Sequence, residues 1–142
     1  MLNGSVIQDR VEEIHRNVAL LTELRALPRE DFLANPKHYL LAERCLQLAI
    51  ECLTDICYYV AGKSRWGKPA NSAEAILLMG HKGVLTSDFA ERIVGMANFR
   101  NILVHAYLAI DRGIVHDHVQ EVEDFYEFER QMLAYLDGGS GR

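Results

Sequence analysis

Three prolines divide this chain into segments whose apolar residues recur every three or four positions. Pro28, Pro36 and Pro69 each fall between such segments. That spacing places apolar side chains on one face of an α-helix, and the interior of a helix excludes proline. We find no segment with the apolar–polar alternation of a half-buried strand. The chain is therefore expected to fold as an all-α protein.

The pattern predicts an antiparallel helical bundle of about five helices with short connections. The expected ranges are 5–26, 36–61, 71–80 or 71–83, 86–110 and 114–136. Asn35 and Pro36 are the residue types favoured at an N-cap and at the first position of a helix. With 142 residues the chain fits one domain. We expect this domain to span residues 1–137, with 138–142 as a flexible tail.

The net charge and the cysteine residues limit the classes of protein to which this chain can belong. A formal net charge of −5 argues against broad, salt-driven binding of nucleic acid, although it allows a local basic site. Cys45 and Cys52 lie roughly 10 Å apart along one predicted helix, too far for a disulfide. With Cys57 they form an odd, apolar set, which is typical of reduced thiols in a cytoplasmic protein. We expect no signal peptide, because the N-terminus soon becomes charged, at Asp9 and Arg10. We expect no membrane association, because no uncharged apolar run could span a bilayer.

Four polar side chains interrupt the strongly apolar segment predicted as the helix over 86–110. They are Arg100, Asn101, His105 and Tyr107. Asn101 and His105 are four residues apart, and Arg100 and Tyr107 share an adjacent line of the helix. Polar groups on a buried helix are costly unless they find partners or perform chemistry. The stretch is the candidate active site; the alternatives are a satisfied buried network or an interface contact.

These residue types suit chemistry on a phosphodiester. Arginine grips phosphate with two parallel hydrogen bonds, and histidine exchanges a proton near neutral pH. Tyr107 can contact the substrate, either by stacking on a base or by a hydrogen bond to a phosphate. RNA carries its own nucleophile, the 2′-OH, so cleavage through a 2′,3′-cyclic phosphate needs one base and one acid. A two-fold dimer would bring two copies of His105 together and supply both roles. No carboxylate cluster or Cys/His set lies near the motif, so we expect no metal and no other cofactor.

Two further stretches allow a functional interpretation. The loop from 62 to 69 is basic and contains Lys63, Arg65, Trp66 and Lys68. It is either a solvated connector with its tryptophan packed on the core, or a rim that contacts phosphates and stacks on a base. His116 and His118 are two apart on a predicted helix and face different ways, so they are expected to be surface residues and not a metal pair.

The stretch from Arg100 to Tyr107 resembles the Arg-x4-His-x-Tyr signature of the HEPN superfamily, and specifically of its HepT-like toxin branch. Other features are similar to that branch. They are the length of the chain, the five-helix pattern and the short stretches at 46–51, 67–69 and 110–111.

This resemblance implies a homodimeric, metal-independent endoribonuclease that acts as the toxin of a HEPN/MNT toxin–antitoxin module. Arg100 would stabilise the phosphate and the transition state, His105 would act as general acid/base, and Asn101 would orient these groups. Both subunits would contribute them across the two-fold axis. The partner would be a nucleotidyltransferase (MNT) antitoxin, which in that family can add AMP to the motif tyrosine, here Tyr107. The alternatives are a non-catalytic nucleotide-binding or nucleotidyltransferase-docking module, and a dimeric structural domain with a vestigial site.

Overall fold

A computed structural model of the chain describes residues 2–140. Over this range it contains eight α-helices, one 3-10 helix (η1) and no strand, which confirms the all-α class. The elements are α1 (Gly4–Arg25), α2 (Arg29–Ala34), α3 (Pro36–Lys63), α4 (Ser72–His81), α5 (Ser87–Ile93), α6 (Gly95–His105), η1 (Tyr107–Ala109), α7 (Arg112–Gln120) and α8 (Glu123–Ser140).

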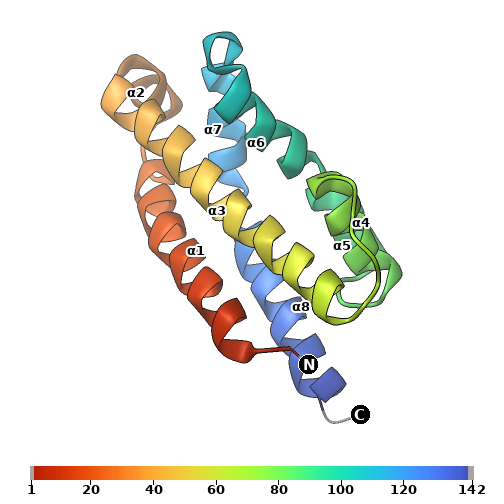
Figure 1. The fold of residues 1–142 in the computed structure, drawn as a ribbon. Helices are drawn as coiled ribbons and strands as arrows, with labels where there is room; N and C mark the ends of the chain where they lie inside the picture. Colours follow the sequence, from red (N-terminus) through yellow and green to blue (C-terminus); the bar gives the residue numbers. More distant parts are fainter. Residues whose placement is uncertain (1, 141–142) are drawn as a thin grey trace.

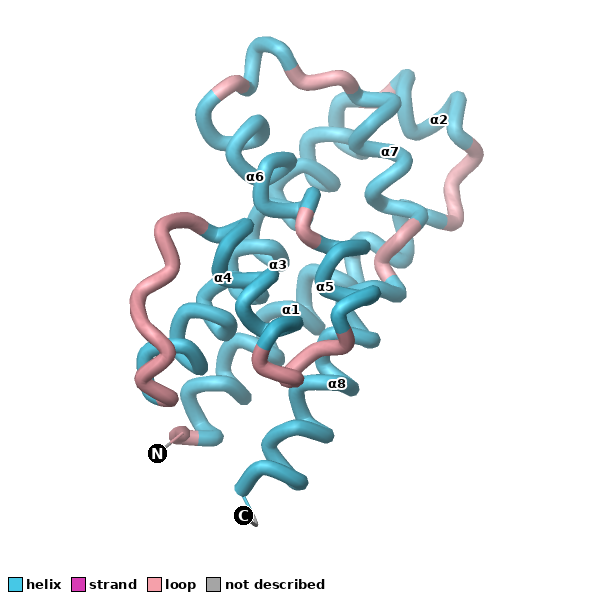
Figure 2. The backbone as a smooth tube through the Cα atoms, turned by 90° about the vertical axis from the view of Figure 1, so that its right-hand side faces the viewer, coloured by secondary structure: helices cyan, strands magenta, loops and turns pink. Residues whose placement is uncertain are grey.

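Helix α3 is the central element of the bundle (Figure 1). Helix α1 lies antiparallel along one side of α3, while α4, α6 and α7 contact its other sides. Helix α2 and the segment between α6 and α7 lie at one end of the bundle, and the loop after α3 lies at the other end (Figures 1 and 2). This arrangement leaves one side of α6 facing away from the bundle.

Helix α3 occupies the centre because its apolar residues cover more than one face. Asn35 caps its start, where the Asn35 side chain accepts a hydrogen bond from the Lys37 backbone N–H at 2.9 Å, as predicted. Burying a large apolar side chain fully contributes about 1.5–3 kcal/mol. The buried residues of α3 are Ala42, Cys45, Leu46, Ala49, Ile50, Leu53, Thr54, Ile56, Cys57, Val60 and Ala61.

The predicted count of about five helices is not confirmed, because two of the expected helices are divided. The helix expected over 86–110 breaks at Val94 into α5 and α6, next to Gly95, a residue with low helix propensity. It also ends at His105, since Ala106 leaves helical geometry (φ −125°, ψ 40°). The helix expected over 114–136 is divided into α7 and α8, and α2 forms within an expected connection.

Buried residues from all eight α-helices form one hydrophobic cluster. Helix α8 continues to Ser140, so it runs through the first three residues of the expected tail at 138–142. The last two residues of that tail lie outside the described residues. Among the described helices, none combines the length and apolar character needed to cross a membrane.

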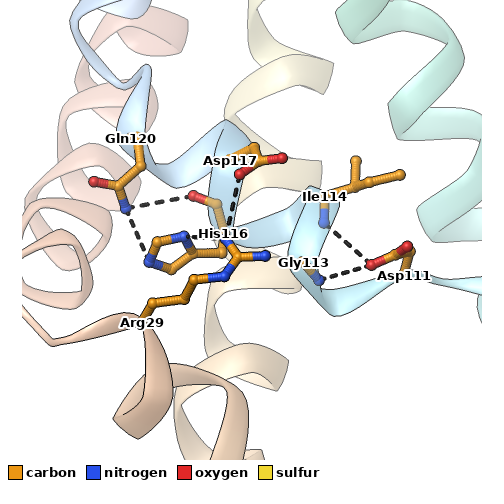
Figure 3. A network of polar contacts seen from close by, with 7 residues as sticks. All are labelled: Arg29, Asp111, Gly113, Ile114, His116, Asp117 and Gln120. Atoms are coloured by element: carbon orange, nitrogen blue, oxygen red, sulfur yellow. Dashed lines mark hydrogen bonds and ion pairs between the residues drawn. The ribbon is translucent and has the colours of Figure 1, made fainter.

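A polar network joins α2 to α7 (Figure 3). The Arg29 NH1 atom lies 3.0 Å from His116 Nδ1 and 3.3 Å from Asp117 Oδ1. The His116 ring also meets Phe32 edge-on, with 5.1 Å between the ring centroids. The prediction of a surface histidine is therefore wrong for His116, which is only 9% exposed. It is also wrong for His118, which is half-buried with its ring stacked on a helix α6 residue, Phe99, at 3.9 Å between centroids.

Acidification is expected to destabilise this fold through the two histidines. Burial lowers the pKa of both His116 and His118 below the ordinary 6.5, and the charge of Arg29 lowers that of His116 further. Each histidine therefore takes up a proton on unfolding in the interval between its folded-state pKa and 6.5. The contribution of these histidines to the free energy of unfolding should be constant well above pH 6.5 and should fall as the pH drops through that interval.

Urea denaturation on both sides of pH 6.5 measures this loss of stability. His118→Phe keeps a ring to stack on Phe99 but cannot titrate, so its stability should depend less steeply on pH. The same slope in both proteins would contradict this account.

Candidate active site

Helix α6 buries one face and exposes the other. Met96, Ala97, Phe99 and Leu103 point into the core. Three of the predicted site residues lie elsewhere on the surface of the helix: Asn101 and His105 are exposed and Arg100 is half-buried. The expectation that this helix is apolar all round and buried is therefore wrong. Helix α6 packs against α3, α4 and α5, and its Phe99 also stacks on His118 of α7; the remaining side of α6 is accessible.

The Arg100 guanidinium is anchored to the central helix α3. Its NH2 and Nε atoms donate to Glu51 Oε1 at 2.8 and 3.2 Å. Gln47, one turn earlier on α3, donates to the same oxygen at 3.2 Å. The NH1 atom of Arg100 donates to Asn101 Oδ1 at 3.3 Å. The arginine is thus held from two sides, while its side chain remains 30% exposed and accessible to an anion.

A second acidic residue lies one turn beyond Glu51 on α3. Asp55 is exposed, with its Oδ2 atom 3.9 Å from Nε of Arg10. Burial raises the pKa of Asp55; the charges of Arg10 and Arg100 oppose this effect, and that of Glu51 adds to it. Two carboxylates one turn apart on α3, Glu51 and Asp55, are therefore each paired with an arginine from another helix. This places Arg100 in a network of compensated charges and not beside an isolated carboxylate.

His105 is the last residue of α6, and its imidazole is exposed. Over residues 2–138 no side chain is hydrogen-bonded to the imidazole of this exposed residue. His105 lies one turn beyond Asn101, which places the two side chains on one face of the helix. The imidazole is therefore free to contact a substrate or a second protein chain.

Tyr107 does not share the helix of the other three residues. It opens η1, after the chain has turned at Ala106, and its side chain is 62% exposed. The next residue, Leu108, is 90% exposed. The α6–α7 segment at this end of the bundle (Figure 2) thus presents an aromatic and an aliphatic side chain to solvent. An exposed phenol in such a segment is accessible to another protein.

The structure brings Arg100 and Asn101 into contact, places His105 on the same helix, and separates Tyr107 from them. The sequence interpretation missed Glu51 and Gln47 as partners of Arg100. Their signal was an amide and a carboxylate four residues apart in the apolar middle stretch of α3, residues 45–53. Across the described residues, no group of three or more His, Cys, Asp and Glu side chains is arranged to hold a metal ion.

The cysteines are poor candidates for chemistry in this site. Cys45, Cys52 and Cys57 are all free thiols. Burial raises the pKa of each of them, and that of Cys52 reaches about 11. A thiol with such a pKa carries almost no thiolate at neutral pH and is a weak nucleophile.

Comparison with known proteins finds one family whose members resemble this chain over most of its length. A family model described as "Ribonuclease HepT-like" matches residues 9–132. The chain is 30% identical over 132 residues to a tRNA nuclease HepT of Aphanizomenon flos-aquae, covering 92% of this chain and 90% of the relative. It is 28% identical over 101 residues to an mRNA nuclease HepT of Shewanella oneidensis, covering 70% of this chain and 73% of the relative.

A solved structure has the same fold. It is a tri-AMPylated HEPN toxin of Shewanella oneidensis in complex with an MNT antitoxin. The TM-score is 0.84 at 23% identity, and the match covers 94% of this chain and 99% of that toxin.

Proposed function

The chain belongs to the HepT-like ribonuclease family, and from this premise we propose that it is the toxin of a HEPN/MNT module, a metal-independent endoribonuclease. One observation carries the proposal: Arg100, Asn101 and His105 occupy the accessible side of α6, with the guanidinium anchored by Glu51 at 2.8 Å. A satisfied buried network, the main alternative from the sequence, would instead hide the imidazole. The ribonuclease names of the two relatives support the same activity.

The proposed reaction uses the 2′-OH of RNA as the nucleophile. A neutral imidazole removes the 2′-OH proton, and the oxygen attacks the adjacent phosphorus. The bond from phosphorus to the 5′-oxygen breaks, and an imidazolium gives that oxygen a proton. The products are a 2′,3′-cyclic phosphate and a 5′-OH. Arg100 stabilises the charge that develops on the phosphoryl oxygens.

This reaction needs one base and one acid, and each chain offers a single motif histidine. A homodimer in which the two α6 helices face each other supplies both, with Arg100 and His105 from each subunit lining a shared groove. The exposure of His105 at the end of α6 supports this arrangement, because the imidazole has no partner within the described part of its own chain.

Cleavage of transfer RNA and of a single-stranded RNA in EDTA tests the activity. We expect fragments that end in a 2′,3′-cyclic phosphate. Strict dependence on an added divalent ion, or the absence of cleavage, would contradict the proposal. Binding of a nucleotide by calorimetry without any RNA cleavage would favour the non-catalytic alternative.

The proposed partner is an MNT-type nucleotidyltransferase that silences the toxin by transferring AMP to Tyr107. The phenol oxygen would attack the α-phosphorus of ATP, pyrophosphate would leave, and the phenolic proton would pass to a base or to water. The high exposure of Tyr107 in η1 supports this role, since a modifying enzyme must reach the hydroxyl. The solved toxin of the same fold carries AMP groups and is bound to an MNT antitoxin.

Tyr107→Phe is expected to remain an active nuclease that the nucleotidyltransferase cannot silence. Incubation with ATP and an MNT-type nucleotidyltransferase, followed by intact-mass spectrometry, measures the transfer. Tyr126→Phe is a matched control, because Tyr126 is an exposed tyrosine on α8. AMP transfer to Tyr107→Phe at the rate of the unmodified chain would exclude Tyr107 as the acceptor.

A further inference from the structure

The loop that follows α3 and its neighbour α4 line an open surface pocket that the proposed reaction does not use. It has a volume of about 390 Å³, and its lining includes Trp66, Lys68, Leu77, Leu78 and His81. Such a volume falls in the usual range for small-ligand sites, about 300–1,000 Å³. We propose that this pocket, called here the Trp66 pocket, binds a base and the adjoining phosphate of single-stranded RNA. The inference rests on the proposed ribonuclease function and names a second contact with its substrate.

The loop that builds the pocket is held in a defined conformation. The backbone N–H groups of Ser64 and Trp66 donate to Val60 O and Ala61 O, both at 3.0 Å, and so tie the loop to the end of α3. Arg65 is the one residue other than glycine with positive φ in the described chain, at 60°. That left-handed conformation is costly for a non-glycine residue and is retained where the surroundings fix it. The pocket is therefore present before any ligand arrives.

Positive charge is concentrated in the loop that lines this pocket and at the helix ends beside it, in a chain whose net charge is −5. Lys63, Arg65 and Lys68 are exposed on the loop. From α4's C-cap, Lys82 adds a fourth cation, with its Nζ atom 5.6 Å from the centre of the Trp66 ring. The carboxylate of Glu74 is the acidic group of the lining, and it accepts a hydrogen bond from the Ala70 backbone N–H at 3.0 Å. The local surplus of cations favours an anionic ligand.

The combination of an aromatic ring, apolar walls and surrounding cations matches single-stranded nucleic acid. Bases stack on aromatic side chains, and lysine and arginine contact the phosphates between them. Trp66 supplies the ring, Leu77 and Leu78 supply the apolar wall, and Lys68 lies at the same pocket. An acidic peptide would use the cations but would not need the indole and the apolar wall.

The distance from the candidate active site suits a short stretch of RNA. Glu51, which holds Arg100, and Lys63, where the loop begins, are both on α3. Twelve residues at 1.5 Å each place them about 18 Å apart along the axis of this helix. A strand whose scissile phosphate is bound at Arg100 would therefore reach the Trp66 pocket within a few nucleotides. The pocket would increase affinity for RNA without entering the reaction.

The chain contains a single tryptophan, so intrinsic fluorescence reports on this pocket directly. We suggest titrating the full-length His105→Ala variant, which is expected not to cleave, with oligouridylate. A base stacked on Trp66 should quench its emission, and anisotropy of fluorescein-labelled oligouridylate should give the same dissociation constant. Lys68→Glu in this background should weaken binding about tenfold and lower the salt dependence of log K by about 0.7 for one lost phosphate contact.

Lys37→Glu is the matched control. It makes the same change of charge at an exposed position at the opposite end of α3, about 40 Å away for a helix of 28 residues. It should leave the titration unchanged. Equal weakening by both variants, or RNA binding without quenching, would overturn the proposal. Equal quenching by polyglutamate would also overturn it and would indicate an acidic protein as the ligand.

Cleavage by the unmodified chain in EDTA separates this inference from the proposed function. If the unmodified chain cleaves RNA and Lys68→Glu leaves KM for single-stranded RNA unchanged, RNA binding by the Trp66 pocket is contradicted and the proposed ribonuclease function stands. If the unmodified chain does not cleave RNA but Trp66 quenching still depends on Lys68, the proposed ribonuclease function is contradicted and RNA binding by the pocket stands.

Discussion

Replacing His105 with alanine is expected to lower kcat for RNA cleavage by about 10²- to 10⁴-fold, the usual contribution of a general acid or base. In the proposed mechanism the imidazole is the proton-transfer group of the motif, and its loss removes base and acid together if two copies face each other. The fold should be unaffected, because His105 is exposed at the end of α6 and makes no hydrogen bond through its ring within the described chain. Surface substitutions of this kind usually change stability by no more than about 0.5 kcal/mol.

Single-turnover cleavage of RNA in EDTA measures this effect, with circular dichroism as the check on folding. His15→Ala is the matched control, since His15 is an exposed histidine of α1 that pairs with Glu129 at 2.6 Å. It should cleave RNA at the rate of the unmodified chain. Equal rates for His105→Ala and His15→Ala would remove the imidazole of His105 from the mechanism.

Arg100→Ala is expected to lower kcat by about 10²- to 10³-fold, comparable with the loss of one preorganised donor to a developing oxyanion. Arg100→Lys should restore little of this activity. A lysine ammonium is a point charge and cannot reproduce the planar fork that binds phosphate through two hydrogen bonds. Rates measured at saturating RNA separate this effect from weaker binding. Full activity of Arg100→Lys would show that only the charge matters.

Glu51→Gln tests whether the anchoring of this arginine matters. Glutamine preserves the shape of the side chain but removes the charge that fixes the guanidinium, so kcat should fall about tenfold while KM changes little. Glu43→Gln is a matched control on the same helix. Glu43 also pairs with an arginine, Arg112, at 3.2 Å, but away from the motif. Equal kcat for the two variants would assign Glu51 a purely structural role.

The fold class could be predicted from the sequence because periodicity and proline placement are local properties. The Asn35–Pro36 start of α3 and the Asn71 cap of α4 lie where the sequence predicts them. The break between α5 and α6 could not be predicted in the same way. Gly95, next to Val94, has low helix propensity, but an isolated glycine within a helical pattern does not by itself predict a break. Helices α5 and α6 both pack against α4, a contact that the local sequence does not reveal.

The sequence marks the residues of the candidate site, but their burial and their contacts could not be predicted from it. The motif stands out because polar side chains follow one another in an apolar segment. Its burial was misjudged: apolar residues lie on several sides of α6, but residues such as Ile102 and Val104 are only half-buried. The contact between Arg100 and Glu51 joins positions 49 residues apart, and no local pattern indicates which acidic residue an arginine will meet.

The central claim is that two copies of His105 act together in one groove, one as base and one as acid. The most direct test is RNA cleavage in EDTA by purified dimers that contain one unmodified subunit and one His105→Ala subunit, each with a different affinity tag. The account predicts activity close to that of the His105→Ala homodimer, because the groove has lost one of its two proton-transfer groups. Half the activity of the unmodified dimer would contradict it, since each subunit would then carry a complete site of its own.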